Sequence, residues 1–171
     1  MASSLPFGRI ERERTVQDTR SALNGIEQAV DTPGILVVDA YGHSREGLTA
    51  SLRVGGYRVE SAAGTWEAIL KAKDGHFGIA VIDLDLPPAH GIMMSGWDLA
   101  RIIRAFHPGA ALILLTTEWS PDLRSQADGL HRARVMEKPI HPGELRALVR
   151  AFQSDRGTAA DDFEQQTRDT R

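Results

Sequence analysis

Carboxylate, hydroxyl and ammonium side chains recur in this sequence directly after, or close behind, short apolar runs. The residues are Asp39, Asp83, Asp85, Thr116 and Lys138. Carboxylates are hard oxygen ligands for Mg²⁺, which usually takes one or two of them and keeps several waters. A carboxylate can also attack a phosphoryl group and become an aspartyl-phosphate. A hydroxyl and an ammonium group can then bind the added oxygens, which carry a charge of about −1.5 to −2.

The apolar runs that precede these residues predict buried strands. The runs are residues 35–38, 57–59, 79–82, 111–115 and 133–136. Continuous Val, Ile and Leu, rather than strict alternation, are typical of strands buried on both faces. A segment that reads as helical follows each run, and the clearest apolar stripes lie at Leu99, Ile102, Ile103 and Phe106 and at Leu145, Leu148, Val149 and Phe152. We therefore predict five βα units that form a five-stranded parallel sheet, doubly wound, with helices on both faces.

The expected sheet brings the reactive side chains to one edge. In open α/β sheets the ligand crevice lies beyond the carboxyl ends of the strands, at the switch in strand order. Predicted strands end directly before Asp39, Asp83 and Thr116, and Lys138 lies just past the last strand. We expect these four side chains to converge on that crevice.

The stretch from about residue 34 to residue 152 resembles the response-regulator receiver domain of bacterial two-component signalling. The matching pieces are Ile-Leu-Val-Val-Asp39 with Arg45 and Leu48 behind it, Gly-Gly-Tyr-Arg-Val59, Val-Ile-Asp83-Leu-Asp-Leu-Pro87, Ser-Gly-Trp-Asp-Leu-Ala-Arg101, Leu-Leu-Thr116-Thr117 and Met-Glu-Lys138-Pro139. No piece is specific alone, and the resemblance is carried by their order and spacing. It implies the flavodoxin-like fold of that family and a signalling module rather than an enzyme.

The resemblance also implies a role for each candidate residue. Asp83 would be the phosphoacceptor, Thr116 the switch hydroxyl and Lys138 a contact to the phosphoryl group. Asp39 and Asp83 would belong to an acidic Mg²⁺ pocket, to which Asp85 would contribute its backbone carbonyl. The Lys138-Pro139 peptide is often cis in this family.

Three features depart from the family pattern. Ala40 stands where the family usually has a second acid, the direct metal ligand, so Mg²⁺ binding is expected to be weakened rather than abolished. The loop 87–96 is longer than usual, and its Met93 and Met94 could tuck into the core edge or form an adaptable contact patch. Val135 stands where the family commonly has an aromatic switch residue.

Each assignment competes with an ordinary structural role. Asp39 and Asp83 could cap the helices that follow them. Thr116 could be a β-branched strand residue, and Lys138 could be a solvated surface lysine. The isolated histidines on the expected active face are His43 and His90. Because metal sites need clustered ligands, we assign neither histidine to the site.

Composition excludes several classes of function. The chain has 171 residues, 20 Lys and Arg against 23 Asp and Glu, and no Cys. This length suits one ordinary globular domain, and the absence of Cys excludes thiolate metal sites and suits the cytoplasm. The balanced charge and the lack of a basic helix argue against direct nucleic-acid binding, and no apolar run is long enough to span a bilayer. No Gly-rich phosphate cradle follows a predicted strand, which argues against a nucleotide-binding enzyme.

The composition also divides the chain into three parts. Residues 1–33 are a polar N-terminal extension with a weak helical stripe at Leu23, Ile26 and Val30. Residues 34–153 form the receiver-like domain, and the polar residues 154–171 read as a disordered tail. The sequence leaves open whether the extension packs on the core, makes a homodimer contact or stays loose.

These features lead us to expect a single-domain response regulator in a phosphorelay. It would accept a phosphoryl group on Asp83 from a histidine kinase or phosphotransfer protein and signal through protein contacts in the cytoplasm, without contacting nucleic acid or membrane. The alternative is a receiver-like interaction module that works without phosphorylation. Ala40, Val135 and the longer 87–96 loop favour that alternative.

Overall fold

The computed structural model describes residues 33–88 and 94–168, with side chains described as far as residue 155. The expected N-terminal extension, apart from Pro33, therefore lies outside the described residues, as do His90 and Met93. Within the described part of the chain, no helix is long and apolar enough to cross a membrane.

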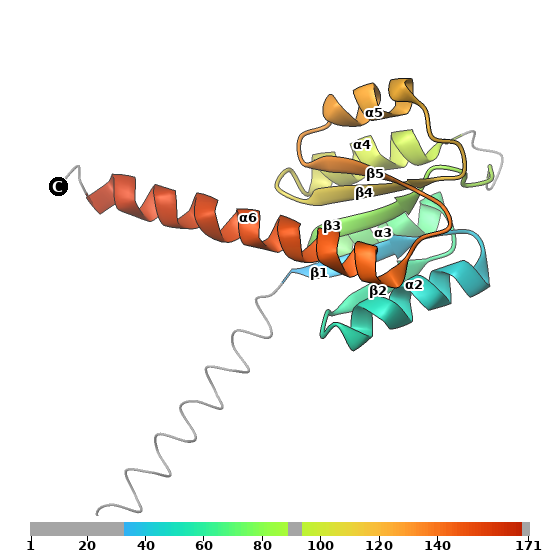
Figure 1. The fold of residues 1–171 in the computed structure, drawn as a ribbon, viewed down its shortest axis with the longest axis horizontal. Coiled ribbons are helices and arrows are strands. Elements are labelled where there is room, and N and C mark those ends of the chain that lie inside the picture. Colours follow the sequence, from blue (N-terminus) through green and yellow to red (C-terminus); the bar gives the residue numbers. More distant parts are fainter. Residues whose placement is uncertain (1–32, 89–93, 169–171) are drawn as a thin grey trace, which may run out of the picture. The chain divides into compact units, whose positions relative to one another are not determined.

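Strand β3 occupies the middle of a parallel sheet whose order is β2-β1-β3-β4-β5. The strands are β1 (Gly34–Val38), β2 (Val59–Ala62), β3 (Phe77–Asp83), β4 (Ala111–Thr116) and β5 (Ala133–Glu137). All neighbouring strands pair in parallel, as Figure 1 shows. The switch in strand order falls between β1 and β3, because the chain turns outward from β1 to β2 and then returns to β3. The predicted five-stranded, doubly wound sheet is confirmed.

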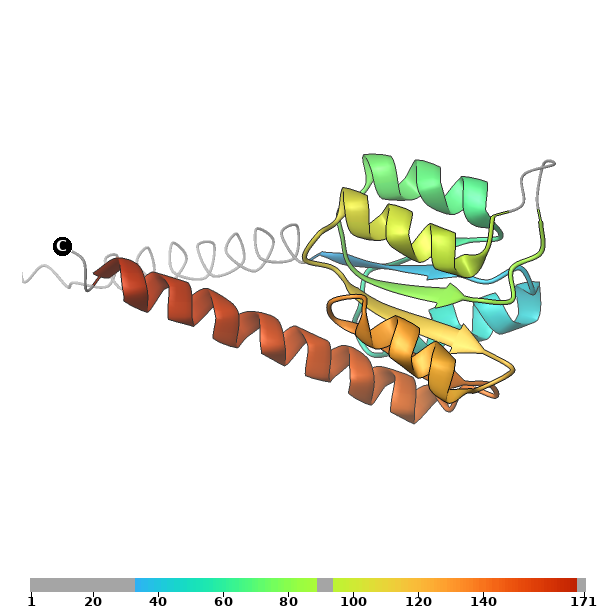
Figure 2. The ribbon, with the colours of Figure 1, turned by 90° about the horizontal axis from the view of Figure 1, so that it is seen from above.

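Each strand is followed by a helix. The helices are α2 (Gly42–Val54), α3 (Thr65–Asp74), α4 (Gly96–Phe106), α5 (Pro121–Asp128) and α6 (Pro142–Arg168). Helices α2 and α6 cover one face of the sheet, and α3, α4 and α5 cover the other (Figure 2). This arrangement buries the sheet on both sides, as its continuous apolar strands require.

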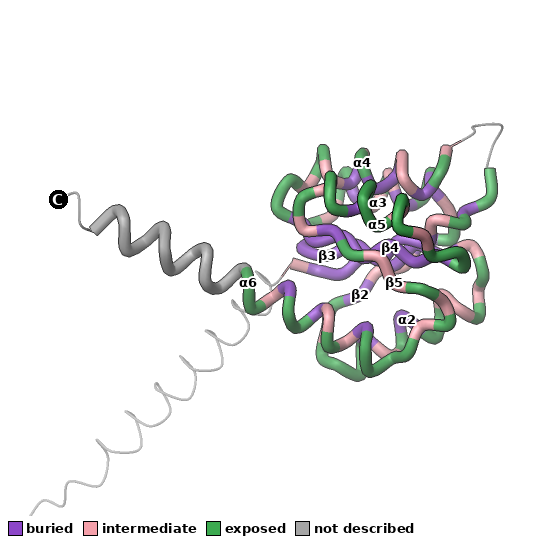
Figure 3. The backbone as a smooth tube through the Cα atoms, turned by 45° about the horizontal axis from the view of Figure 1, so that its top comes forward, coloured by how far each residue is buried: buried purple, intermediate pink, exposed green. Residues whose placement is uncertain are grey.

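Two apolar cores result, one on each face of the sheet. Alternate residues of β1 divide between them: Leu36 and Val38 face α3 and α4, whereas Ile35 and Val37 face α2 and α6. The predicted stripe on α6 is confirmed at its buried members, Leu145, Val149 and Phe152. Figure 3 shows β3 and β4 in the buried layer between helices whose outer faces are exposed, and β1 is buried throughout as well, whereas the edge strands β2 and β5 are buried only in part.

The second strand lies later in the chain than predicted. We predicted a strand over 57–59, but β2 runs from Val59 to Ala62. Tyr57 still belongs to the turn, since its backbone N–H donates to the Leu52 carbonyl of α2. Glu60 and Ser61 concealed the strand because they are polar, which an edge strand tolerates better than a central one.

The C-terminal segment also differs from the expectation. We expected a disordered tail from residue 154, whereas α6 continues as a helix to Arg168 (Figures 1 and 2). Its part beyond Phe152 lacks proline and contains one glycine, and half of its residues are the good helix formers Ala, Glu, Gln and Arg. A helix nucleated by packing can extend through such residues at little cost per residue, so an apolar stripe is not required.

Side chains from two helices cap the exposed edge of β2. The Val59 carbonyl accepts a hydrogen bond from Arg53 Nη2 (3.0 Å), and the Ser61 carbonyl accepts one from Lys71 Nζ (2.5 Å). Glu67 accepts from the Ala63 N–H (2.8 Å), which is the main cause of its lowered pKa, and it pairs with Lys71 at 3.0 Å. Unpaired groups on an edge strand can pair with another chain, so these caps protect the edge.

We predict that Lys71→Met lowers the free energy of unfolding by about 1 kcal/mol, because the Ser61 carbonyl loses its donor. The Ser61 region should also exchange its amide hydrogens faster. Lys73→Met is the matched control, since Lys73 is exposed on the same helix and the charge change is identical. Urea denaturation and amide exchange of the two variants make the comparison, and equal behaviour of both would contradict the capping role.

Candidate functional site

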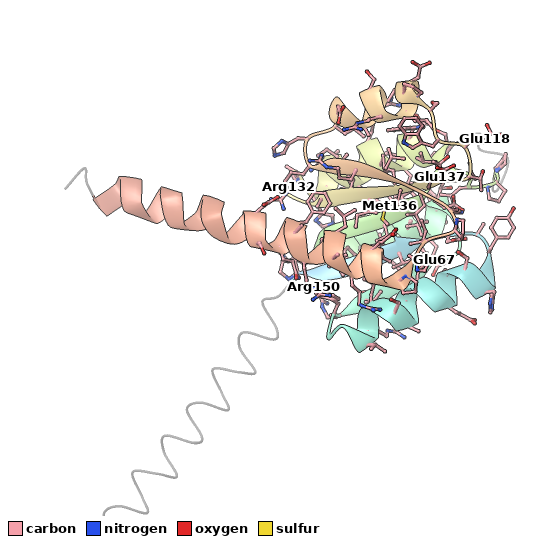
Figure 4. The ribbon with its side chains drawn as sticks, viewed as in Figure 1. Glu67, Glu118, Arg132, Met136, Glu137 and Arg150 are labelled. Carbon is pink, nitrogen blue, oxygen red and sulfur yellow. The ribbon has the colours of Figure 1, made fainter. Side chains whose placement is uncertain are left out.

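The sheet register brings the predicted residues to one edge. Val38 of β1 pairs with Ile82 of β3, so Asp39 and Asp83 come next on neighbouring strands. On the other side Asp83 pairs with Leu115 of β4, and Thr116 follows it. Asp39, Asp83 and Thr116 have exposed fractions of 0%, 0% and 3%, so the edge holds a buried polar cluster. Figure 4 shows Glu118 and Glu137 at this end of the domain and Arg132 at the opposite end.

Asp83 is the centre of the cluster. Its Oδ1 accepts a hydrogen bond from the Asp85 backbone N–H (3.0 Å). Its Oδ2 lies 2.7 Å from Lys138 Nζ, an ion-pair contact without hydrogen-bond alignment, so this buried oxygen accepts no hydrogen bond. Lys138 is itself only 17% exposed at its side chain and directly follows β5. The peptide bond from Lys138 to Pro139 is cis, as the resemblance implied. The structure therefore brings Asp83 and Lys138 together.

Asp39 is held by the start of helix α2. Its Oδ1 accepts from the Tyr41 backbone N–H (2.8 Å) and its Oδ2 from the Ser44 hydroxyl (2.6 Å). Arg45 Nη1 donates to the Asp39 backbone carbonyl at 2.7 Å. Each carboxylate oxygen thus accepts one of these bonds. These contacts do not make Asp39 a helix cap, because the N-cap of α2 is Tyr41 and no side chain caps this helix. An oxygen with two lone pairs can still take a second partner.

The Asp85 side chain turns away from Asp83. Its Oδ2 accepts two hydrogen bonds from Thr117, from the backbone N–H and from the hydroxyl, both at 3.0 Å. These bonds tie the turn after β3 to the loop after β4. Asp85 is exposed, so water competes with both of them.

The Thr116 hydroxyl faces its own loop. It donates to the Glu118 carbonyl (3.1 Å), and its oxygen accepts from the Glu118 N–H (3.1 Å). The Thr116 carbonyl accepts from the Lys138 N–H (2.8 Å), which pairs the ends of β4 and β5 through the backbone and does not involve the hydroxyl. A rotation of this side chain would be needed for it to act as a switch hydroxyl toward Asp83.

Helix α4 begins directly against the backbone of Asp83. A Cβ on Gly96 would lie 2.5 Å from the Asp83 carbonyl oxygen and 2.6 Å from Leu84 Cα, so only glycine fits there. Ser95 and Asp98 form a capping box, and the Ser95 hydroxyl is the main cause of the lowered pKa of Asp98. The tight start of α4 keeps the turn after β3 in place.

The residues present fit a weakly held hard cation. Asp83 Oδ2 is a buried oxygen that accepts no aligned hydrogen bond, and Asp39 directly follows the neighbouring strand β1. Ala40 packs against the core instead of supplying an acid, and no group of three His, Cys, Asp or Glu among the described residues could hold a metal ion. Two carboxylates with water completing the shell are within the range that Mg²⁺ accepts. The Asp85 side chain is not gathered with the other two.

Some site contacts carry no signal in the sequence. Ser44 and Thr117 hold the two flanking aspartates, yet their roles depend on loop geometry rather than on strand position. Other sequence features lie outside the cluster. His43 is an exposed residue of α2, and Met94 is half-buried. Val135, at the place expected for an aromatic residue, is half-buried and lines a hollow of about 340 Å³ with Trp119.

We predict that Lys138→Met lowers the free energy of unfolding by about 3 kcal/mol, because it leaves the fully buried Asp83 carboxylate without its counter-charge. Asp83→Asn in the same background should recover most of that loss. A double-mutant cycle by urea denaturation at neutral pH measures the coupling. Strictly additive effects would mean that the two side chains do not interact.

Comparisons with known proteins agree with this geometry. The family model described as the response regulator receiver domain matches residues 35–150. The transcriptional regulatory protein CusR of Escherichia coli K12 is 28% identical over 118 residues, which cover 69% of this chain and 50% of CusR. A response regulator receiver protein of Anaeromyxobacter, Anae109_2439, is 30% identical over 105 residues, which cover 61% of this chain and 42% of that protein. The chain thus spans about half the length of the curated relatives it matches.

Solved structures show the same fold. The chemotaxis protein CheY4 of Vibrio cholerae superposes with a TM-score of 0.63 at 25% identity, covering 70% of this chain and 98% of CheY4. A CheY-like receiver domain protein from Methanospirillum hungatei has a TM-score of 0.66 at 24% identity, covering 74% and 98% of the two chains. The latter likeness bears on the fold alone.

Proposed function

Because the chain belongs to the response regulator receiver family, we propose that it accepts a phosphoryl group on Asp83 and signals through a change in the loops after β4 and β5. The observation that carries the proposal is the environment of the carboxylate oxygen Asp83 Oδ2. This oxygen is buried, accepts no hydrogen bond and faces the Lys138 ammonium group. A nucleophilic oxygen beside a fixed positive charge suits attack on a phosphoryl group.

Each residue around Asp83 would have a defined task in the transfer. Asp83 Oδ2 forms the bond to phosphorus while the bond from phosphorus to the donor breaks, and the donor keeps that electron pair. Lys138 neutralises part of the charge that arrives. Mg²⁺, held by Asp39 and Asp83, would supply further neutralisation of the phosphoryl oxygens. Thr116 would then exchange the Glu118 carbonyl for a phosphoryl oxygen, which moves its loop.

The family also defines the kind of partner. Receiver domains work with histidine kinases or phosphotransfer proteins and act as signalling modules rather than as enzymes. For this chain we propose such a protein as the phosphoryl donor in a phosphorelay, and another protein, not nucleic acid, as its target. The balanced charge supports a protein target. The absence of Cys supports a cytoplasmic location.

Phosphorylation is tested by incubating the protein with acetyl phosphate and Mg²⁺ and measuring its intact mass. We expect an added mass of about 80 Da, one phosphoryl group, that Asp83→Ala abolishes. Asp128→Asn is the control, since it alters an exposed carboxylate at the far end of α5, away from the site. We expect a smaller yield when EDTA replaces Mg²⁺. An unchanged mass with acetyl phosphate and with a cognate kinase would contradict the proposal.

A second function is favoured by the contacts of Asp39. The family's second acid is replaced by Ala40, and Asp39 already accepts hydrogen bonds from Tyr41 and Ser44. These contacts suit a receiver-like interaction module that works without phosphorylation, with Asp39 as part of the scaffold.

Beryllofluoride, a phosphoryl mimic, separates the two functions. With Mg²⁺ we expect it to shift the amide resonances of Asp83, Thr116 and Lys138 if the site accepts phosphoryl groups. Asp83→Asn, which cannot bind the mimic covalently, is the control. A spectrum that does not respond at millimolar beryllofluoride would favour the constitutive module.

A further inference from the structure

Asp85 connects the turn after β3 to the loop that begins directly after Thr116, the last residue of β4. Its backbone N–H donates to Asp83 Oδ1, and its carboxylate binds Thr117. Thr117 is the residue directly after Thr116. A continuous path of hydrogen bonds therefore runs from the Asp83 carboxylate through Asp85 to the start of the loop after β4.

The contact is bidentate on the threonine side. One carboxylate oxygen accepts from both the backbone N–H and the hydroxyl of Thr117, each at 3.0 Å. Bonds to an ionised acceptor are stronger than neutral ones, and two donors from one residue fix its orientation as well as its distance. Asp85 thus holds the Thr117 peptide in one orientation.

That orientation determines where the Thr116 hydroxyl can point. While the Thr117 peptide keeps this orientation, the Thr116 hydroxyl donates to the Glu118 carbonyl and accepts from the Glu118 N–H, each at 3.1 Å. The hydroxyl can turn toward Asp83 only by giving up these two bonds. A fixed Thr117 peptide keeps the Glu118 N–H and carbonyl in place for these two hydrogen bonds.

We propose that Asp85 is a positioning residue whose contact with Thr117 latches the loop after β4 and keeps the Thr116 hydroxyl turned away from Asp83. The proposal deepens the proposed function, because a latch on this loop would set how readily the site switches. Asp85 and Thr117 are both exposed, so the latch is weak enough to open. Two weak bonds can bias a two-state loop without locking it.

The latch is tested first on the protein without any phosphoryl mimic, so that the result does not depend on phosphorylation. Three-bond couplings of the Thr116 methyl group report its χ1 rotamer. We expect one rotamer in the parent protein and averaging between rotamers in Asp85→Ala and in Thr117→Val. Thr117→Val keeps the side-chain shape and the N–H donor, so its effect should be the smaller. A single, parent-like rotamer in both variants would overturn the proposal.

A second measurement follows the latch bonds directly. The Thr117 amide hydrogen should exchange about two- to tenfold faster in Asp85→Ala, the effect of losing about one net hydrogen bond. Asp128→Asn is the matched control, since it removes the same charge from an exposed residue at the far end of α5. Equal exchange in Asp85→Ala and the control would also overturn the proposal.

The response to beryllofluoride with Mg²⁺ then links the latch to switching. In the variants we expect the half-maximal concentration to fall by about two- to tenfold, because less of the binding free energy is spent on opening the loop. If the parent does not respond, the proposed function fails and the Thr116 rotamer alone decides the latch. If the parent responds but the variants keep one rotamer, the latch fails and the proposed function stands.

Discussion

A carboxylate with no exposed surface ends the central strand, and the cost of burying it organises the polar contacts around it. Removing one partner from a buried ion pair typically costs several kcal/mol, so Asp83 must keep Lys138 nearby. The ammonium arrives from β5, two strands away in the sheet, only because all strands run in the same direction and end at the same edge. The cis peptide, the Gly96 close approach and the α4 capping box all lie beside this pair. Asp83 Oδ2 contacts the Lys138 ammonium group without an aligned hydrogen bond, and this is the property the proposed chemistry uses.

The convergence of Asp39, Asp83, Thr116 and Lys138 could be predicted because it depends on strand ends alone. In a parallel sheet the residue after each strand has a predictable place, and the apolar runs show where the strands end. The contacts of Ser44 and Thr117 could not be predicted in this way. They depend on loop paths and side-chain rotamers, which leave no periodic pattern in the sequence.

The fold predictions failed where solvent, rather than the core, surrounds the chain. The edge strand β2 was predicted wrongly because Glu60 and Ser61 interrupt its apolar pattern. Its stability comes from one neighbouring strand and from side-chain caps instead of apolar burial. The last part of α6 was missed because the prediction required an apolar stripe, whereas a helix that is already packed can continue through polar helix formers. Hydrophobic periodicity in a sequence predicts the elements that pack against the core. It does not predict elements that lack such packing, such as this edge strand and this helix end.

Ala40 supplies no acid, and the three carboxylates at this edge of the sheet differ in the contacts they make. Asp39 and Asp85 flank Asp83, and each accepts hydrogen bonds from a nearby hydroxyl, that of Ser44 or of Thr117. Both flanking carboxylates therefore act as acceptors that hold loops in place: the start of α2 in one case and the loop after β4 in the other. Of these three carboxylates, only that of Asp83 has a buried oxygen that accepts no hydrogen bond. A ligand at this edge would compete with loop contacts wherever it engaged Asp39 or Asp85. Under the proposed function, occupancy of the site would therefore be coupled to the positions of these two loops.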